Sequence, residues 1–289
     1  MAVLPRRVAR VRPLPAARPD EQFFVASDVP GTAAGGDTWT VVDSPFPGSR
    51  ANTSSPWREG WRPGRTVAQD RFAFLAPSVP ANVLGMAHNT GRAGRALPPQ
   101  AFHKAATSVI GPGEEILLAP GMARVEPEAE LAVVIGRTAR ALTPATAREA
   151  VFGYTIANDV TCRDLQETDE LWFSAKSQDT FTPAGPWIAT GLDVSGLEIG
   201  VALNGTALET ASTADLGWTV DEILVYLSSV LTLHPGDLVL TGFPAATSPL
   251  SPGDTVVCRV EGIGELANPV GVAPWRGVPG RIRTGGMSA

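Results

Sequence analysis

The sequence predicts a β-rich mixed α/β fold, and three observations support this prediction. Short apolar segments rich in Val, Ile and Leu follow one another along most of the chain. Turn sequences separate these segments, and only two stretches have helical character. Short apolar runs bounded by turn residues are typical of strands. We therefore expect many strands and few helices.

The turns have a repeated chemistry, Pro-Gly followed by an acidic residue. Proline fixes φ at the first central position of a turn, and glycine adopts the positive φ of the second. Each turn leads into an apolar segment that we expect to be a strand. The pairs of turn and strand are 112–114 with 116–118, 235–237 with 238–240, and 252–254 with 256–258.

Two helices and one change of composition complete the predicted organisation. Helices are expected over 143–152, after a threonine cap, and over 219–231, where apolar residues recur at helical spacing. The segment 28–64 is rich in Gly, Pro, Ser and Asp, and only 39–43 has a strand pattern. We expect a small N-terminal domain over 1–75 and a larger domain over 76–289. Trp57 and Trp61 are expected to dock onto the larger domain, with the mouth of a site or a subunit contact as alternatives.

Three carboxylates give the strongest functional signal. Glu128 and Glu130 open the apolar run 131–136, and Asp159 closes the run 154–158. Residues two apart on a strand point the same way, so the two glutamates project side by side. Two buried anions this close raise each other's pKa unless a cation lies between them. An all-oxygen set suits Mg²⁺ or Mn²⁺, and two solvated glutamates at a surface strand are the alternative.

The motifs around these carboxylates resemble those of the fumarylacetoacetate hydrolase family, in one order from about residue 83 to 270. They read EAELAVVIG over 128–136, GYTIANDVTCRDLQ over 153–166, AKSQDTFTPAGPW over 175–187 and VEGIG over 260–264. The resemblance implies a fumarylacetoacetase-type β-roll catalytic domain with a small N-terminal domain. It also implies that Glu128, Glu130 and Asp159 bind the metal, and that the protein is a homodimer.

Lysine is rare in this chain. Of the 23 Lys and Arg residues, only Lys104 and Lys176 are lysines, and both fall inside the resemblance. A lysine ammonium is a compact point charge that can lose its proton, whereas arginine stays charged. We expect Lys176 to be catalytic, neutralising a substrate carboxylate or a developing enolate oxygen, and Lys104 to bind substrate. Chance remains the alternative for both positions.

Further substrate contacts are expected from residues near these motifs. Arg163 and Gln166 are three apart and share a face on a helical turn, where they could hold the distal end of a substrate. A surface ion pair of Arg163 with Asp164 or Glu167 is the alternative. Thr241 matches a family threonine that can bind a carboxylate. Phe243 replaces the second threonine of that motif and should make this wall more apolar.

The general base departs from the family pattern. Family hydrolases activate water with a His–Glu pair on a mobile lid, but the segment 83–95 has no second histidine, and no glutamate lies between its start and Glu114. His88 is the only histidine nearby and could be a relocated base, a hydrogen-bond donor or a structural residue. We expect His103 to face away from Lys104, His234 to be exposed, and Cys162 to be a buried spectator.

Charge and length limit the other functions. The net charge of −6 argues against nucleic acid as the main partner, and no apolar run approaches a membrane span. Two cysteines are too few for a disulfide framework, which favours a cytoplasmic location.

Together these features predict a Mg²⁺- or Mn²⁺-dependent hydrolase that cleaves a C–C bond in a 2,4-dioxo acid through a metal-stabilised enolate. An oxo-acid decarboxylase or keto–enol isomerase with the same metal site is the alternative. A metal-binding subunit without catalytic activity is a further one.

Overall fold

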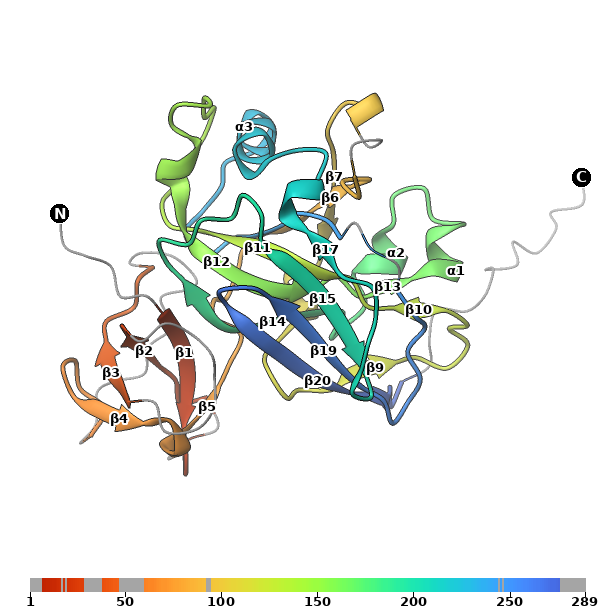
Figure 1. Cartoon of the computed structure of the whole chain (residues 1–289). Coiled ribbons are helices and arrows are strands. Elements are labelled where there is room, and N and C mark those ends of the chain that lie inside the picture. The colour runs from red at the N-terminus through yellow and green to blue at the C-terminus, as the bar shows by residue number, and fades with distance from the viewer. Residues whose placement is uncertain are drawn as a thin grey trace, which may run out of the picture.

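The structure is a computed structural model of the 289-residue chain and describes residues 7–16, 18, 20–28, 38–46, 60–91, 95–243, 245 and 247–275. Figure 1 shows a β-rich molecule with few helices, as the sequence predicts. The α-helices of the described residues are α1 (Arg163–Gln166), α2 (Phe173–Lys176) and α3 (Val220–Val230), and short 3₁₀ helices are at Gln69–Arg71, Ala106–Ser108, Ala147–Ala150 and Thr213–Asp215. None of them is long and apolar enough to cross a membrane.

The larger sheet has twelve strands, most of them along one hydrogen-bonded path. In spatial order the path is β4 (Thr66–Ala68), β3 (Thr38–Val42), β2 (Phe23–Ser27), β1 (Arg7–Pro13), β14 (Thr182–Ala189), β12 (Val151–Asn158), β11 (Ala129–Ile135), β18 (Leu238–Leu240), β6 (Val83–Ala87) and β7 (Gln100–Lys104). Two further strands pair at its side, β5 (Phe72–Phe74) with β1 and β8 (Val109–Ile110) with β14.

The second sheet has six strands and packs on the first (Figure 1). Its order is β16 (Thr206–Ala207), β15 (Glu198–Leu203), β19 (Thr255–Val260), β20 (Gly264–Val272) and β9 (Ile116–Leu118), with β17 (Ala211–Ser212) beside β15. A separate pair joins β10 (Val125–Glu126) to β13 (Thr161–Cys162).

Strand β11 lies between two apolar layers because both of its faces are buried. Leu131 and Val133 belong to the core that includes residues of β15 and β19. Ala132 and Val134 belong to a second core on the other face. Central strands buried on both faces are expected to be uniformly apolar, which is why this segment carries no polar residue after Glu130.

The predicted turns and strands are confirmed. Gly113, Gly236 and Gly253 all have positive φ, and the strands β9, β18 and β19 follow them. Helix α3 is confirmed as well, and the Thr219 side chain caps it by accepting from the backbone N–H of Glu222 at 3.4 Å.

The helix predicted over 143–152 is wrong except for one short turn. Only Ala147–Ala150 forms a 3₁₀ helix, and residues 151 and 152 already belong to β12. The Gly136 N–H donates to the Ala150 carbonyl at 2.7 Å, and Val151 pairs with Ile135. Pairing with β11 therefore outweighs the helical propensity of the alanines.

The N-terminal strands continue the sheet of the larger part. Val8 of β1 pairs with Ile188 of β14, so the proposed boundary near residue 75 is crossed by hydrogen bonds, and two separate domains stay a prediction. Trp61 is buried and stacks on Phe23 with ring centres 5.1 Å apart. It packs within the N-terminal strands, and Trp57 lies outside the described residues.

Candidate active site

The carboxylates meet where β11 begins and β12 ends. The strands are antiparallel, and Ala129 pairs with Asn158. The Asp159 N–H donates to the Glu128 carbonyl at 2.8 Å, which ties the two strand ends together. One oxygen atom from each of Glu128, Glu130 and Asp159 lies within 4.8 Å of the other two. The structure thus brings the three predicted metal ligands into one group.

Lys176 joins this group from helix α2. Its Nζ donates to Glu128 Oε2 at 2.8 Å and to Asp159 Oδ2, and it lies 4.7 Å from the centre of the Phe102 ring. Burial acts to lower the pKa of this lysine, but the Asp159 and Glu128 carboxylates outweigh it and raise the pKa above its usual value. Lys176 is therefore a charged ammonium in contact with two of the carboxylates.

Lys104 lies behind the carboxylates, not in the cavity. Its side chain is fully buried and its Nζ donates to Asp159 Oδ1 at 2.5 Å and to the Phe181 carbonyl at 2.9 Å. The prediction that Lys104 contacts substrate therefore has no support in the structure, because protein atoms enclose the ammonium. His103, its neighbour on β7, is exposed on the other face, as predicted.

Arg163 is a second cation of the site, and its guanidinium contacts Glu126 and Glu128, which were not predicted as its partners. Its Nη2 donates to Glu128 Oε1 at 2.7 Å, its Nε to Glu126 Oε2 at 2.8 Å and its Nη1 to Gln166 Oε1 at 2.9 Å. The alternative of a surface pair with Asp164 or Glu167 is not observed. Arg163 and Gln166 do share one helical face, and both line the cavity.

The acids of the group have opposite titration behaviour. Burial acts to raise the pKa of Glu128, but Lys176 and Arg163 hold it at about 2. Burial raises the pKa of Glu130 well above its usual value, and the charges of Asp159 and Glu128 add to this effect. Among the described residues Glu130 has no ion pair, and Oε2 accepts from the Gly242 N–H at 2.5 Å.

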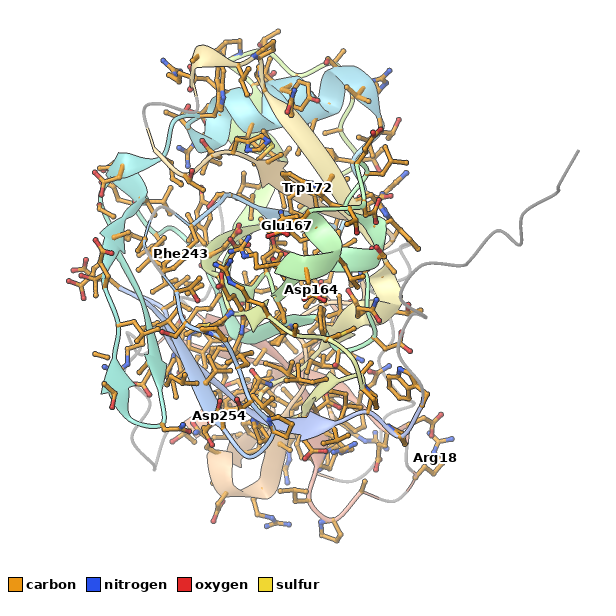
Figure 2. The ribbon with its side chains drawn as sticks, turned by 90° about the vertical axis from the view of Figure 1, so that its right-hand side faces the viewer. Arg18, Asp164, Glu167, Trp172, Phe243 and Asp254 are labelled. Atoms are coloured by element: carbon orange, nitrogen blue, oxygen red, sulfur yellow. The ribbon has the colours of Figure 1, made fainter. Side chains whose placement is uncertain are left out.

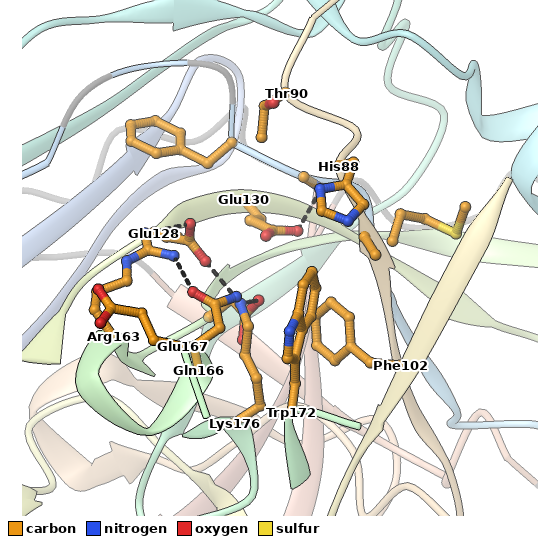
Figure 3. Close-up of a pocket in the computed structure, with 15 residues that line it drawn as sticks. His88, Thr90, Phe102, Glu128, Glu130, Arg163, Gln166, Glu167, Trp172 and Lys176 are labelled. Carbon is orange, nitrogen blue, oxygen red and sulfur yellow. Dashed lines mark hydrogen bonds and ion pairs between the residues drawn. The ribbon is translucent and has the colours of Figure 1, made fainter. Parts of the chain in front are cut away.

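A cavity of about 350 Å³ opens over the carboxylates. Figure 3 shows Lys176, Arg163 and the two glutamates on one side and Trp172 and Phe102 on the other. Figure 2 shows Trp172, Glu167 and Phe243 around the same region, far from Asp254 and Arg18. Phe243 lines the cavity, and a more apolar wall at this position stays a prediction.

His88 stands at the edge of this cavity. It follows β6, has a positive φ of 58°, and is exposed. Its imidazole packs edge to face on Trp172 with ring centres 5.1 Å apart. Among the described residues it makes no hydrogen bond to a carboxylate, so a His–Glu pair is not assembled here.

Thr241 is placed differently from the prediction. Its Oγ1 donates to the Leu131 carbonyl at 2.9 Å and its side chain is buried outside the cavity lining. The neighbouring Gly242 lines the cavity instead, with φ of 108°. A Cβ at Gly242 would lie 2.4 Å from the Asn89 carbonyl oxygen, so only glycine allows this close approach.

Several residues of the site were not predicted from the sequence. Trp172, Phe102 and Glu167 line the cavity, and Glu126 holds Arg163. Trp172 and Glu167 lie in the connections next to Lys176 and Arg163, and this proximity was the one available indication. The buried Cys162 thiol donates to Asp164 Oδ1 at 3.2 Å and does not line the cavity, which agrees with a spectator role.

Comparisons with known proteins agree with this architecture. The sequence profile of the fumarylacetoacetate (FAA) hydrolase C-terminal family matches residues 78–271. A solved structure described as a 5-carboxymethyl-2-hydroxymuconate delta-isomerase from Mycobacterium smegmatis superimposes with a TM-score of 0.78 at 35% identity, covering 92% of this chain and 100% of that one.

Two relatives with named activities are similar in sequence. A maleylpyruvate hydrolase from Aquipseudomonas alcaligenes is 37% identical over 168 residues, which are 57% of each chain. A mitochondrial oxaloacetate tautomerase from Bos taurus is 34% identical over 184 residues, 60% of this chain and 59% of that protein. The matched part thus spans less than two thirds of either relative. These relatives are enzymes, and the profile match covers most of the described catalytic part: the chain belongs to the fumarylacetoacetate hydrolase family.

Proposed function

We propose that the chain is a metal-dependent enzyme that interconverts the keto and enol forms of a 2-oxo acid, such as a 2,4-dioxo acid. The observation that carries this proposal is the charged Lys176 ammonium beside Glu128 and Asp159, on the floor of a cavity that also exposes one imidazole. Such a cavity can bind an anionic substrate and exchange a proton with it.

The donor set fits a divalent cation. Three carboxylates converge, and among the described residues no nitrogen or sulfur ligand accompanies them and Glu130 has no ion pair. Hard cations such as Mg²⁺ and Mn²⁺ prefer oxygen ligands of this kind. Glu128, Glu130 and Asp159 would hold the ion, which would supply Lewis acidity toward the oxygen atoms of an oxo acid.

Lys176 is suited to electrostatic stabilisation. Its raised pKa keeps the amine protonated, and a protonated amine cannot attack a carbonyl carbon. The ammonium would instead donate hydrogen bonds to an anionic substrate oxygen as negative charge develops there. A Schiff base between Lys176 and the substrate is therefore disfavoured.

His88 is the group we assign to proton transfer. An imidazole can act as a general base and take a proton from the carbon next to a keto group. Its place at the exposed edge of the cavity lets the proton pass on to solvent. The isomerase and tautomerase among the similar proteins have names that fit this chemistry.

Hydrolysis of a C–C bond in a 2,4-dioxo acid is the second candidate. The similarity to a maleylpyruvate hydrolase favours it. It requires activated water, and the described cavity residues lack the His–Glu pair that would provide the base. Decarboxylation of an oxo acid would use the same parts without activated water. A cytoplasmic homodimer with a small oxo acid as its substrate is part of the proposal.

Proton NMR in D₂O separates these reactions. The purified chain would be incubated with Mg²⁺ or Mn²⁺ and with acetylpyruvate or oxaloacetate, and an EDTA sample would show the metal dependence. We expect deuterium exchange at C3 above the enzyme-free rate without cleavage. Replacing His88 with Ala should slow the exchange about 100-fold. Replacing the exposed His103 with Ala is the matched control and should not.

Each outcome of this experiment identifies a reaction class. Formation of two shorter acids would show that the reaction is hydrolysis and not isomerisation. Release of CO₂ would show that it is decarboxylation. Equal exchange rates with and without protein, for every compound tested, would contradict the proposal.

A further inference from the structure

Two residues in a rare backbone conformation meet beside the carboxylates. His88 and Trp172 have φ of 58° and 57°, in the left-handed region that residues other than glycine seldom adopt. Their rings pack edge to face, with ring centres 5.1 Å apart and an angle of 72° between the ring planes. Such conformations persist where the surrounding structure enforces them, often at ligand sites. The surrounding structure therefore holds His88 and Trp172 in place as part of the cavity wall.

The connection from α1 to α2 holds the Trp172 indole in this place. Asp169 Oδ2 accepts from the Ser174 N–H at 2.6 Å and from its Oγ at 2.7 Å, and the Trp172 N–H donates to the Asp169 carbonyl at 2.9 Å. The Lys176 N–H in turn donates to the Trp172 carbonyl at 2.9 Å. One short hydrogen-bonded segment thus positions both the catalytic ammonium and the indole.

A second cavity lies on the other side of this wall. Its volume is about 360 Å³, similar to the 350 Å³ of the cavity over the carboxylates. Four residues line both cavities: Ala87, His88, Phe102 and Trp172. The Trp172 ring also packs against the Phe102 ring, with ring centres 5.7 Å apart (Figure 3). The aromatic side chains are therefore a partition shared by the two spaces.

The chemistry of the second cavity differs from that of the first. Its remaining lining is Gln100, Ala101, Glu170, Leu171 and Tyr226, which combines apolar and aromatic surface with one acid. In the described lining of this cavity the charged side chain is Glu170, and no lysine or arginine is present. The space would accept an alkyl chain and would repel a second carboxylate.

We infer that Trp172 determines substrate length, because its indole closes the active site against the second cavity. The inference rests on the proposed function in one respect, that the first cavity takes a 2-oxo acid. With the indole present, only a short substituent on the oxo acid fits beside Lys176. Without it, the two cavities join and an alkyl tail extends into the second.

Calorimetry with 2-oxo acids of increasing length tests this inference on the full chain in the presence of Mn²⁺. The ligands are 2-oxobutanoate and 2-oxooctanoate, whose tails differ by four methylene groups. Burial of one methylene is worth roughly a fourfold change in affinity. For Trp172→Gly we expect the ratio of long-chain to short-chain affinity to rise at least about tenfold over the wild type. Glycine adopts the left-handed conformation without strain, so the backbone can keep its path.

Two control variants distinguish the loss of the indole between the cavities from a general structural effect of substitution in this segment. Trp172→Phe keeps an aromatic ring at the partition and should keep a ratio close to that of the wild type. Phe173→Ala changes the adjacent side chain, which is 63% exposed and lines neither cavity, and should leave the ratio unchanged.

The outcomes are distinct from those for the proposed function. If both acids bind the folded Trp172→Gly protein with the wild-type ratio, Trp172 is not a length determinant. If neither acid binds any of the four proteins, the ligand class is wrong, and the inference fails together with the proposed function.

Discussion

Seven side chains of alternating charge connect the interior to the edge of the cavity. In order of contact they are Lys104, Asp159, Lys176, Glu128, Arg163, Glu126 and Arg124. Each acid in the series contacts two cations. Buried ions are costly unless they are paired in this way, so the series explains how acids can gather beside the cavity without mutual repulsion. Glu130, outside the series, is the one whose pKa is raised.

Lys104 should matter for stability through its contact with Asp159. Replacing Lys104 with Met removes a buried cation and leaves one side of the carboxylate without its partner. Loss of one partner of a buried pair typically costs about 3 kcal/mol. We expect a decrease of that size in the free energy of unfolding, measured by urea denaturation.

The matched control for Lys104→Met is Arg259→Met. Arg259 pairs with Glu265 at 3.0 Å, but both side chains are more than half exposed, so we expect less than about 1 kcal/mol. Equal effects of the two substitutions would show that burial of the Lys104 pair does not contribute to stability.

Cys162 should be chemically inert despite its position near Asp159. Burial raises the pKa of its thiol to about 12, and burial also raises the pKa of Cys258. The thiolate is the reactive form, so its fraction at pH 8 is about 10⁻⁴. We expect no modification of the native chain by iodoacetamide at pH 8 and two modified cysteines in urea, counted by mass spectrometry. Rapid loss of activity from alkylation of native Cys162 would contradict a spectator role.

At the residue scale, the sequence predicted the acids better than it predicted their partners. Glu128, Glu130 and Asp159 could be found because strand periodicity and a family motif agree on them. The place of Lys104 could not be found, because alternation along β7 gives the face of the side chain but not the depth of the carboxylates behind it. Trp172 was missed because it lies in a connection, where no periodicity applies.

At the scale of elements, strands β6 and β7 fix the position of Phe102, one residue of the partition between the two cavities, through a close approach at Gly85. A Cβ on Gly85 would lie 2.1 Å from the ring of Phe102 across the strand pair. Since Phe102 also contacts Trp172, the glycine sets the position of the wall.

Gly85→Ala should therefore displace Phe102 and disturb the site. Overpacking of a well-packed region typically costs 1–3 kcal/mol, so we expect a loss of about 2 kcal/mol in the free energy of unfolding and weaker binding of oxo acids. Gly196→Ala is the control, because a Cβ there has nothing within 4 Å. A fully active Gly85→Ala protein of unchanged stability would show that the wall adapts freely.

Local elements could be predicted where the sequence pattern and the tertiary contacts favour the same structure. The Pro-Gly turns need no partner, and α3 has both a cap and an apolar face. The segment 143–152 has helical residues too, but pairing of Val151 with Ile135 decides its conformation. That pairing depends on residues of β11, outside the segment itself, so the composition of 143–152 alone does not reveal it.

At the scale of the whole molecule, the larger sheet runs from the N-terminal strands to the active site. β1 pairs with β14, β14 with β12, and β12 with β11, where the carboxylates begin. Trp39 of β3 and Trp187 of β14 also pack together, with ring centres 6.0 Å apart. The composition change near residue 75 could not reveal this continuity, because strand pairing across it is non-local.

Removal of the N-terminal strands tests this continuity. A chain starting at residue 76 would expose the edge of β14 and the buried face of Trp187. Exposed strand edges and apolar surface promote association. We expect the truncated chain to elute as aggregates in size-exclusion chromatography, with no cooperative thermal unfolding by circular dichroism. A monodisperse, cooperatively unfolding product would establish residues 76–289 as an independent domain.

The central claim is that Glu128, Glu130 and Asp159 hold one divalent cation, and calorimetric titration of Mn²⁺ into chain treated with EDTA and then dialysed tests it most directly. We predict one ion per chain for the wild type and at least tenfold weaker binding for Glu130→Gln, with the exposed Glu265→Gln as the control at wild-type affinity. Absence of binding, or an affinity that Glu130→Gln leaves unchanged, would contradict the claim.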